Sequence, residues 1–437
     1  MEHPKSQSLS VIAGIKALSP AIMFLLVYVG ISLLAHDFYA MPVTVALLVA
    51  SVWGLLIMRG SPLGARVETF SRGAANTDIL YMIWIFILAG AFAALAKDMG
   101  AIDATVGLTF RIFPSYLILP ACFFAACIIS FAIGTSVGAV VALTPLIVEI
   151  SQAAGQPIPL FVAAGLGGAF FGDNLSFISD TTIAATRTQR CALRDKFRAN
   201  IRVVLPAAVI TLAIYAMLGD EIQASLPHNE SKWWLTLPYL TVIVTAISGL
   251  NVMLVLLAGI LMAIGLGLCA DIGIMQACRT MGSGIDSMGQ LIIITMLAAG
   301  MLSLIKAMGG IDFLLRVMTS HIRSRAAAKW CIAALVSLVN LCTANNTIAI
   351  LTVGDLSRKI SARFDIAPMR TASLLDSCSC IVQCLIPYGA QSLLAAGLAG
   401  ISPGSMWPYL YYPWILALAV AASIFFGRNP QKNHIMV

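Results

Sequence analysis

The chain of 437 residues is too apolar for a water-soluble fold. Hydrophobic residues make up 60% of it and charged residues only 10%, whereas a soluble domain carries about 25% charged residues. The formal charge of +7 indicates no nucleic acid partner, because lysine and arginine gather in a few loops where they set membrane orientation. The composition therefore predicts an all-α integral membrane protein whose partner is the lipid bilayer.

Apolar runs long enough to cross a bilayer recur from one end of the chain to the other. A bilayer core about 30 Å thick needs roughly 20 apolar residues per helix, so we expect about 12 to 14 transmembrane helices, two of them discontinuous. The expected spans lie near residues 20–35, 42–58, 79–96, 116–133, 137–150, 160–182, 201–218, 233–249, 251–270, 291–305, 330–341, 347–356, 367–399 and 407–426.

Basic residues are concentrated in four loops, at residues 59–72, 187–202, 316–329 and 358–370. With this set of spans, all four loops fall on one side of the membrane. Cytoplasmic loops are enriched in lysine and arginine. We therefore expect a multi-pass protein whose N-terminus and C-terminus are both cytoplasmic.

The two halves of the sequence resemble each other. Residues 95–103 (LAKDMGAID) align with 304–312 (LIKAMGGID), an offset of 209 (306 − 97). Two further blocks follow in the same order at similar offsets, and an odd number of spans separates the repeats, which predicts two inverted repeats with discontinuous helices. The predicted division is 1–77 for spans outside the repeat, 78–219 for repeat 1, 220–285 for a connecting hairpin, 286–427 for repeat 2, and 428–437 for a cytoplasmic tail.

Breaks in the apolar runs fall at matching places of the two repeats. Residues 134–138 match 343–347, and residues 172–182 match 383–391. Irregular backbone at membrane depth is tolerated only where it lines a cavity or is buried in protein. Inverted repeats with broken helices hold their substrate at the midplane, between the half-helix ends. We expect the transport site at these four breaks.

The break at 172–182 is dense in polar side chains. Asp173 and Asp180 lie seven residues apart, and a carboxylate facing lipid costs about 2.5–3.5 kcal/mol. Carboxylate, hydroxyl and amide oxygens are the ligands of small hard cations. The pattern predicts a site for Na⁺ or a proton, with Asp173 and Asp180 as Na⁺ ligands; alternatively, Asp180 pairs with the basic loop that follows. The site would also include Asn174, Ser176, Ser179, Thr181 and Thr182.

The other breaks supply further candidates for a substrate site. Asp376 is a third acid inside an apolar run, and an ion pair with Arg370 is the alternative reading. Neutral polar residues in these breaks explain helix contacts about as well as ligation. The remaining candidates are Thr135, Ser136, Asn345, Asn346, Gln383 and Gln391.

The segment FFGDNLSFISDTT (170–182), followed by a basic loop, resembles the signature of NhaC-type sodium/proton antiporters in the wider ion transporter superfamily. The resemblance implies an exchanger of the bacterial inner membrane that moves Na⁺ against H⁺ and needs no cofactor. The resemblance also implies that some relatives exchange dicarboxylates or amino acids. The positions that match the motif are Gly172, Asp173, Ser176, Ser179, Asp180, Thr181 and Thr182.

Antiport follows if Na⁺ and H⁺ compete for the same buried carboxylates while the repeats rock. No phosphate-binding loop or catalytic nucleophile stands out in the sequence, so neither an enzyme nor an ATP-driven pump is expected. The alternative is an ion-coupled carrier of a small organic solute, bound at Asn345, Asn346 and Gln391. Paired broken helices disfavour a passive channel, and a homodimer is left open.

Overall fold

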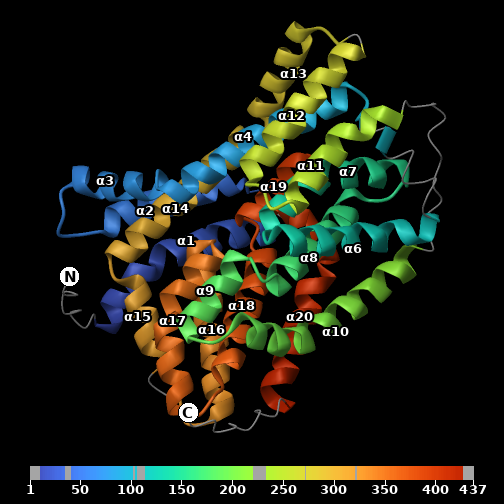
Figure 1. Ribbon diagram of the computed structural model, residues 1–437. Helices are drawn as coiled ribbons and strands as arrows, with labels where there is room; N and C mark the ends of the chain where they lie inside the picture. Colours follow the sequence, from blue (N-terminus) through green and yellow to red (C-terminus); the bar gives the residue numbers. More distant parts are fainter. Residues whose placement is uncertain are drawn as a thin grey trace.

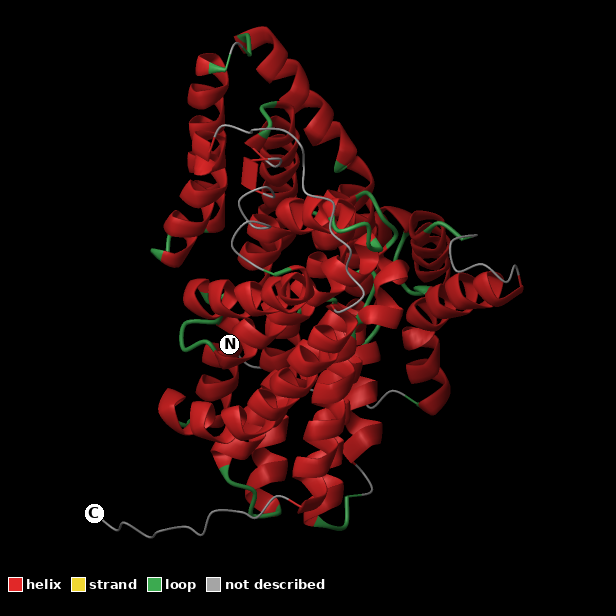
Figure 2. Cartoon of the chain, turned by 90° about the vertical axis from the view of Figure 1, so that its right-hand side faces the viewer, coloured by secondary structure: helices red, strands yellow, loops and turns green. Residues whose placement is uncertain are grey.

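The computed structural model describes residues 10–34, 41–101, 104–105, 114–219, 233–270, 272–319 and 322–426. The described part of the chain contains helices and loops only (Figure 2). The predicted tail, 428–437, lies outside the described residues. The helices are α1 (Val11–Leu34), α2 (Val43–Ile57), α3 (Leu63–Ala74), α4 (Thr77–Asp98), α6 (Ser115–Ile133), α7 (Ser136–Ala153), α8 (Ile158–Leu175), α9 (Asp180–Gln189), α10 (Leu193–Gly219), η1 (Trp233–Thr236), α11 (Leu237–Ile247), α12 (Val252–Cys269), α13 (Ile274–Ser287), α14 (Gly289–Ala307), α15 (Gly310–Thr319), α16 (Arg325–Thr343), α17 (Asn346–Arg363), α18 (Pro368–Leu385), α19 (Ala390–Ala399), η2 (Pro403–Tyr409) and α20 (Tyr411–Phe426).

The predicted spans fall on these helices, and the two discontinuous spans, 160–182 and 367–399, fall on the pairs α8–α9 and α18–α19. By length and apolarity, ten described stretches could cross a membrane, or eleven if the bent pair η2–α20 is one span. This is fewer than expected because α2 and α11 are short for a bilayer and α17 carries charged residues in its second half. The predicted break between two spans at 249–251 is confirmed, since α11 ends at Ile247 and α12 begins at Val252. The Asn251 side chain caps α12 by accepting from Met253 N at 2.9 Å. The amphipathic helices α3, α13 and α15 were not predicted.

Four consecutive helices recur at one constant offset. Helices α6, α7, α8 and α9 have 19, 18, 18 and 10 residues, and α16, α17, α18 and α19 have the same lengths. Each begins 210 residues after its counterpart, as 325 − 115 shows for the first pair. The structure therefore replaces the offsets near 209 from the sequence blocks with 210. On this offset Gln383 corresponds to Asp173, whereas Gln391 corresponds to Thr181.

The connections between these helices repeat as well. Left-handed backbone occurs at Gly134 (φ 78°) and again at Ala344 (φ 48°), where α6 and α16 end. A tertiary hydrogen bond also recurs at the offset of 210. Ser130 Oγ donates to the Ala169 carbonyl at 2.5 Å, and its counterpart Asn340 Nδ2 donates to the Ser379 carbonyl at 2.8 Å. Matching backbone and matching tertiary bonds show that the two units share one three-dimensional arrangement.

The two units exchange helices with each other. Helix α19 packs against α7, and its counterpart α9 packs against α17. Helices α2 and α3 pack on α14, while α12 and α13 pack on α4. Figure 1 shows these two sets as separate arms beside a core that holds α6–α10 and α16–α20. The reciprocal contacts extend the correspondence beyond 78–219 and 286–427, because α2, α3 and α12 lie outside those boundaries and α13 begins 12 residues before the second one (286 − 274).

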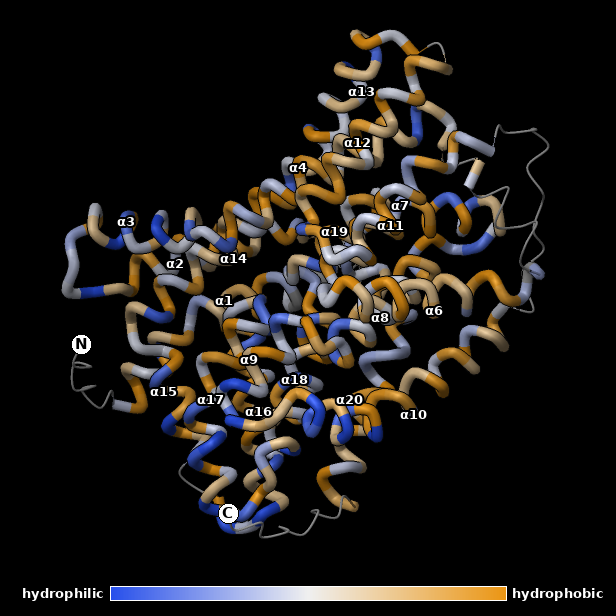
Figure 3. Tube along the Cα trace, viewed as in Figure 1, coloured by the Kyte–Doolittle hydropathy of each residue, from blue (hydrophilic) through white to orange (hydrophobic). Residues whose placement is uncertain are grey.

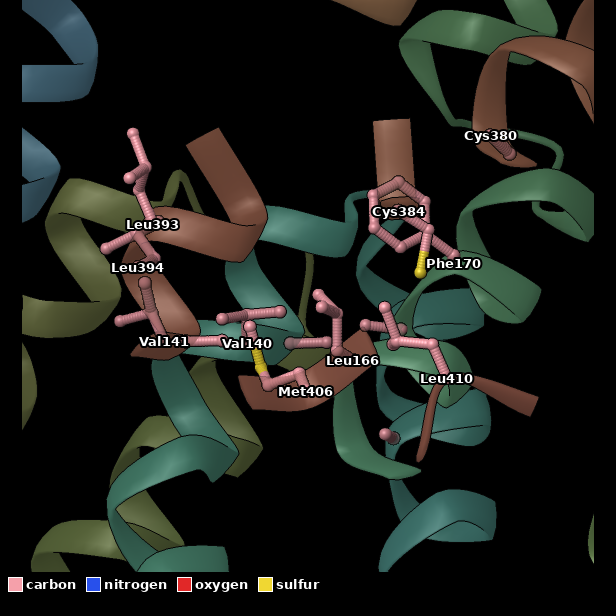
Figure 4. Packing of buried hydrophobic residues seen from close by; sticks show 14 of the residues in the cluster. Val140, Val141, Leu166, Phe170, Cys380, Cys384, Leu393, Leu394, Met406 and Leu410 are labelled. Carbon is pink, nitrogen blue, oxygen red and sulfur yellow. The ribbon is translucent and has the colours of Figure 1, made fainter. Parts of the chain in front are cut away.

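Close packing fixes α8, the helix that carries the polar motif. A Cβ added at Gly168 would meet the Phe123 carbonyl, and one at Gly172 would meet the backbone of α6. Small residues four apart let two helices approach closely. Around them, Val140, Leu166, Leu394 and Met406 meet in an apolar layer built from α7, α8, α19 and η2 (Figure 4).

Hydrophilic positions gather at the end of the molecule where α16 and α17 lie (Figure 3). The buried residues within the helix breaks are largely polar, whereas the helices that carry them contribute most of the buried apolar core.

Candidate functional site

Asp173 lies in the last turn of α8, immediately before the break that separates α8 from α9. Its side chain is buried, with 5% exposed. Ser136 Oγ, at the first residue of α7, donates to Asp173 Oδ2 at 2.7 Å. Ser179 Oγ donates a short hydrogen bond to Asp173 Oδ1, and Ser179 Oγ lies 2.8 Å from Thr181 Oγ1. Since the single hydroxyl proton of Ser179 is used in the hydrogen bond to the carboxylate, Thr181 Oγ1 is the donor in the bond to Ser179.

A chain of side-chain hydrogen bonds joins Asp173 to the other repeat. Gln391 Nε2, at the start of α19, donates to Ser136 Oγ at 3.1 Å. Gln383 Nε2 on α18 donates to Gln391 Oε1 at 3.0 Å and to the Ala344 carbonyl at 2.8 Å. Four helix breaks, two from each repeat, thus meet around one hydrogen-bonded relay. The structure brings together the four breaks at which the sequence places the site.

A second buried cluster holds an ion pair. Lys196 on α10 and Asp376 on α18 form a short ion pair, with 1% and 0% of their side chains exposed. Lys196 Nζ also donates to the Asn174 carbonyl at 2.6 Å and to Thr182 Oγ1 at 2.7 Å. The three protons of the ammonium group are therefore matched by three oxygens. This arrangement neutralises Asp376 and ties the α8–α9 break to repeat 2.

Asn200, one turn after Lys196, completes this second cluster. Asn200 Nδ2 donates to the carbonyl and the side-chain oxygen of Asn174, at 2.8 and 2.6 Å. Its Oδ1 accepts from Ser373 Oγ at 2.7 Å and from Ser377 Oγ at 3.0 Å. Every polar atom of this asparagine side chain contacts either the break or α18, so α10 is tied to the end of α8 and to α18.

Some predicted site residues lie elsewhere. Asp180 is on the exposed side of the first turn of α9, and the described structure gives it neither a hydrogen bond nor an ion pair, with the basic loop or with Asp173. Ser176 Oγ instead donates to the Phe131 carbonyl at 2.9 Å and anchors the break on α6. Thr135 and Asn345 are the N-cap residues of α7 and α17. The structure therefore does not join the two acids of the motif.

The structure also settles the partner of Asp376. The alternative ion pair with Arg370 is wrong, because Asp376 pairs with Lys196. Lys196 and Asn200 were missed because Lys196 stands among basic residues and was assigned to a cytoplasmic loop. Their spacing of four places them on one face of a helix with Val204 and Ala207, both buried. A lysine on the apolar face of a helix was the available signal.

The two buried acids differ in their charge environment. Asp376 has the ammonium of Lys196 beside it. The side-chain donors to Asp173 are the hydroxyl groups of Ser136 and Ser179, and among the described residues it has no basic side chain within ion-pair distance. A buried carboxylate without a counter-ion favours uptake of a cation or a proton, because either removes its net charge.

Known proteins similar to this chain are membrane antiporters. The sequence model of the Na⁺/H⁺ antiporter family matches residues 4–220 and 224–428. The Na⁺/H⁺ antiporter NhaC of Bacillus subtilis (strain 168) is 25% identical over 387 residues, which cover 80% of this chain and 83% of that protein. The malate-2H⁺/Na⁺-lactate antiporter of the same organism is 22% identical over 444 residues, 93% of each chain.

Among solved structures, the Alcanivorax borkumensis YdaH transporter aligns with 95% of this chain and 100% of its own, at 14% identity and a TM-score of 0.41.

Proposed function

Since this chain belongs to the Na⁺/H⁺ antiporter family, a family of secondary transporters, we propose that Asp173 is the carboxylate at which Na⁺ and H⁺ compete. The observation that carries the proposal is that this carboxylate is buried without a basic side chain beside it. Asp173 is buried at the junction of α7, α8 and α9, and the side chains that donate to it are neutral hydroxyl groups. Asp376, the other buried acid, is already neutralised by Lys196.

The groups around Asp173 suit both ions. A serine hydroxyl carries one donor and two acceptor lone pairs, and it rotates to suit its partner. Ser136 and Ser179 donate to the carboxylate in the structure described here. When Na⁺ binds, the same hydroxyls turn their lone pairs to the cation, as small hard cations take oxygen ligands. When a proton binds instead, the carboxyl group becomes neutral and the cation loses its main ligand.

Exchange requires that the loaded site opens to each side of the membrane in turn. In transporters with inverted repeats, one repeat rocks against the other around a fixed midplane site. The relay from Asp173 through Ser136 to Gln391 and Gln383 crosses the interface between repeats. We assign the moving boundary to this interface, with both termini cytoplasmic in a bacterial inner membrane, and with the repeat units inverted as the sequence predicts.

A second candidate function is ion-coupled exchange of a small organic solute. It is supported by the similarity to an antiporter named for malate and lactate. A specific feature of the site favours it too. Two buried amide atoms near the repeat interface, Asn346 Nδ2 and Gln383 Oε1, have no hydrogen-bond partner in the described structure. This function uses the same cation site at Asp173 and adds a second ligand.

The cation site is tested by exchange in proteoliposomes. Purified protein is reconstituted, a pH gradient is imposed, and uptake of ²²Na⁺ is followed for wild type, Asp173→Asn and Asp180→Asn. Asp173→Asn should abolish exchange, whereas Asp180→Asn should retain it because Asp180 is exposed and does not contact Asp173. Elution profile and thermal stability in detergent check folding. Wild-type exchange by a folded Asp173→Asn protein would exclude Asp173 from the site.

A further inference from the structure

The ammonium group of Lys196 lies at a point surrounded by oxygen atoms. Its ion-pair partner is Asp376, and Nζ also donates to the Asn174 carbonyl at 2.6 Å and to Thr182 Oγ1 at 2.7 Å. Each of these four residues is buried, with no more than 1% exposed. Carboxylate, carbonyl and hydroxyl oxygens are the ligands that small hard cations take. The oxygens around Nζ are therefore a set that a free cation could also use.

The three oxygens direct lone pairs to this point. The Asn174 carbonyl has no helical partner because α8 ends there. In a continued helix it would accept from the amide of the residue four positions later, Ile178, but Ile178 N donates to Ser176 Oγ at 3.3 Å. The Thr182 hydroxyl donates to Asp376 Oδ2 at 3.3 Å, so a lone pair of its oxygen faces Nζ. The break in α8 thus prepares a place for positive charge.

The repeat-2 copy of this cluster carries no charge. On the offset of 210, Lys196 corresponds to Met406 (406 − 196) and Asp376 to Leu166 (376 − 166). Met406 and Leu166 are both buried, in the apolar layer of Figure 4. The helices make corresponding contacts, since α10 packs on α18 while η2 and α20 pack on α8. The fold therefore accommodates methionine and leucine at these two places, and packing alone does not require the ion pair.

The other two groups of the cluster differ between the copies as well. Asn174 corresponds to Cys384 (384 − 174) and Thr182 to Ser392 (392 − 182). In repeat 2, Ser392 Oγ donates directly to the Cys384 carbonyl at 3.4 Å. In repeat 1, the ammonium bonds to both equivalent oxygens. The two oxygen groups bond to each other in the copy that lacks a carboxylate, and to a cation in the copy that has one.

We propose that Asp376, Asn174 and Thr182 form a second cation site, and that the ammonium of Lys196 is a built-in ion that occupies it. The tethered charge neutralises the carboxylate and excludes Na⁺ from these oxygens. Lys196 therefore limits the number of Na⁺ ions that the protein binds. That the remaining Na⁺ is the exchanged one rests on the proposed role of Asp173, whereas the second site itself does not.

Removing the ammonium should open the second site to Na⁺. Lys196→Ala leaves the Asp376 carboxylate buried without a counter-ion, and a buried charge must be paired or neutralised. Equilibrium binding of ²²Na⁺ to purified protein is measured at alkaline pH, with choline chloride holding the ionic strength constant. Lys196→Ala should bind one more Na⁺ per chain than wild type. The double variant Lys196→Ala with Asp376→Asn should return to the wild-type number, because it lacks the carboxylate.

Melting temperatures in detergent give a second readout that does not depend on transport. A ligand that binds only the folded protein raises its stability. Lys196→Ala should melt below wild type in choline chloride and should regain part of the loss, in a saturable way, as NaCl replaces choline chloride. The double variant should show no such added recovery. If Lys196→Ala does not fold, Lys196→Gln keeps the chain length, offers an amide oxygen as a further ligand and should gain the same ion.

A matched control is available at Lys329. This lysine is also buried, and it donates to the Ile424 carbonyl at 3.4 Å. Among the residues that the structure describes, no acid lies within ion-pair distance of it. Lys329→Ala removes the same side chain without exposing a carboxylate. The number of bound Na⁺ ions and the Na⁺ dependence of melting should therefore stay at the wild-type level.

The outcomes separate the second site from the site at Asp173. If folded Lys196→Ala and Lys196→Gln proteins bind no more Na⁺ than wild type, the proposal is overturned and Lys196 has only a structural role. A gain that persists after Asp376→Asn, or that Lys329→Ala shares, would overturn it too. If Asp173→Asn retains exchange while Lys196→Ala gains an ion that requires Asp376, the role of Asp173 fails and the second cation site stands.

Discussion

Lys196 and Asp376 form an ion pair that is buried completely and joins α10 of one repeat to α18 of the other. The ammonium is held by the break between α8 and α9 as well, through the Asn174 carbonyl and Thr182 Oγ1. The pair therefore stabilises the backbone that presents Asp173. It also places a positive and a negative charge together, so that the second cluster adds no net charge beside the cation site.

Removing one partner of this pair should destabilise the protein more than removing both. Breaking a buried pair leaves one charge uncompensated and costs about 3–5 kcal/mol, whereas replacing both with apolar residues of similar size is often neutral. We expect Lys196→Met and Asp376→Leu each to lower the melting temperature in detergent, and the double variant to recover most of the loss.

The exposed pair of Arg72 and Glu68 on α3 provides the control for this measurement. Pairs at the surface contribute about 0–1 kcal/mol, so Arg72→Met should change the melting temperature little. If Lys196→Met has an equally small effect, the ion pair does not hold the helix break in place.

The apparent Na⁺ constant of exchange should depend on pH if both ions use Asp173. Where Na⁺ displaces one proton, each pH unit gained should lower the constant about tenfold, which is about 1.4 kcal/mol. The dependence should flatten at pH values where the Na⁺-free carboxylate has already lost its proton. Initial rates of ²²Na⁺ uptake at several pH values measure it. A constant that stays flat across the pH range, with exchange intact, would place the proton on another group.

The contact between α6 and α8 should tolerate no added methyl group at Gly172. A Cβ there would meet the Phe131 amide nitrogen and Ser130 Cβ. Overpacking a close contact costs about 1–3 kcal/mol, and it would also displace Asp173, the next residue. We expect Gly172→Ala to lower both stability and exchange. Gly265→Ala on α12, where the added Cβ meets nothing within 4 Å, is the matched control and should behave as wild type.

The sequence predicts the spans and the breaks well because both signals are local. Long apolar runs and polar interruptions such as 172–182 can be seen without knowing the fold. The offset between repeats was blurred because few residues are identical between them. Lys196 was assigned to a loop because a basic run looks the same whether its residues face water or a buried acid. The partners of Asp173 could not be predicted either. Ser136 meets it through the packing of α7 on α8, and Gln391 reaches Ser136 only through the exchange of helices between repeats.

Ala344 provides a test of the repeat at the level of the backbone. It has left-handed backbone at φ 48°, where its counterpart Gly134 has φ 78°. A side chain in this conformation costs about 1–2 kcal/mol, and glycine avoids that cost but is more flexible in the unfolded chain, which offsets about 0.4–1 kcal/mol. Ala344→Gly should therefore raise stability by a few tenths to about 1 kcal/mol.

The opposite change at the counterpart should have the opposite sign. Gly134→Ala adds a side chain at positive φ, and its Cβ would also meet Ile178, so the loss should exceed the gain at Ala344. Melting temperatures of the two variants in the same detergent give the comparison. Because Ala344 offers its carbonyl to Gln383, a stabilised Ala344→Gly protein should keep the relay and its exchange activity. A fall in stability for Ala344→Gly would mean that residue 344 does not share the left-handed conformation of Gly134, and that the two breaks are not equivalent.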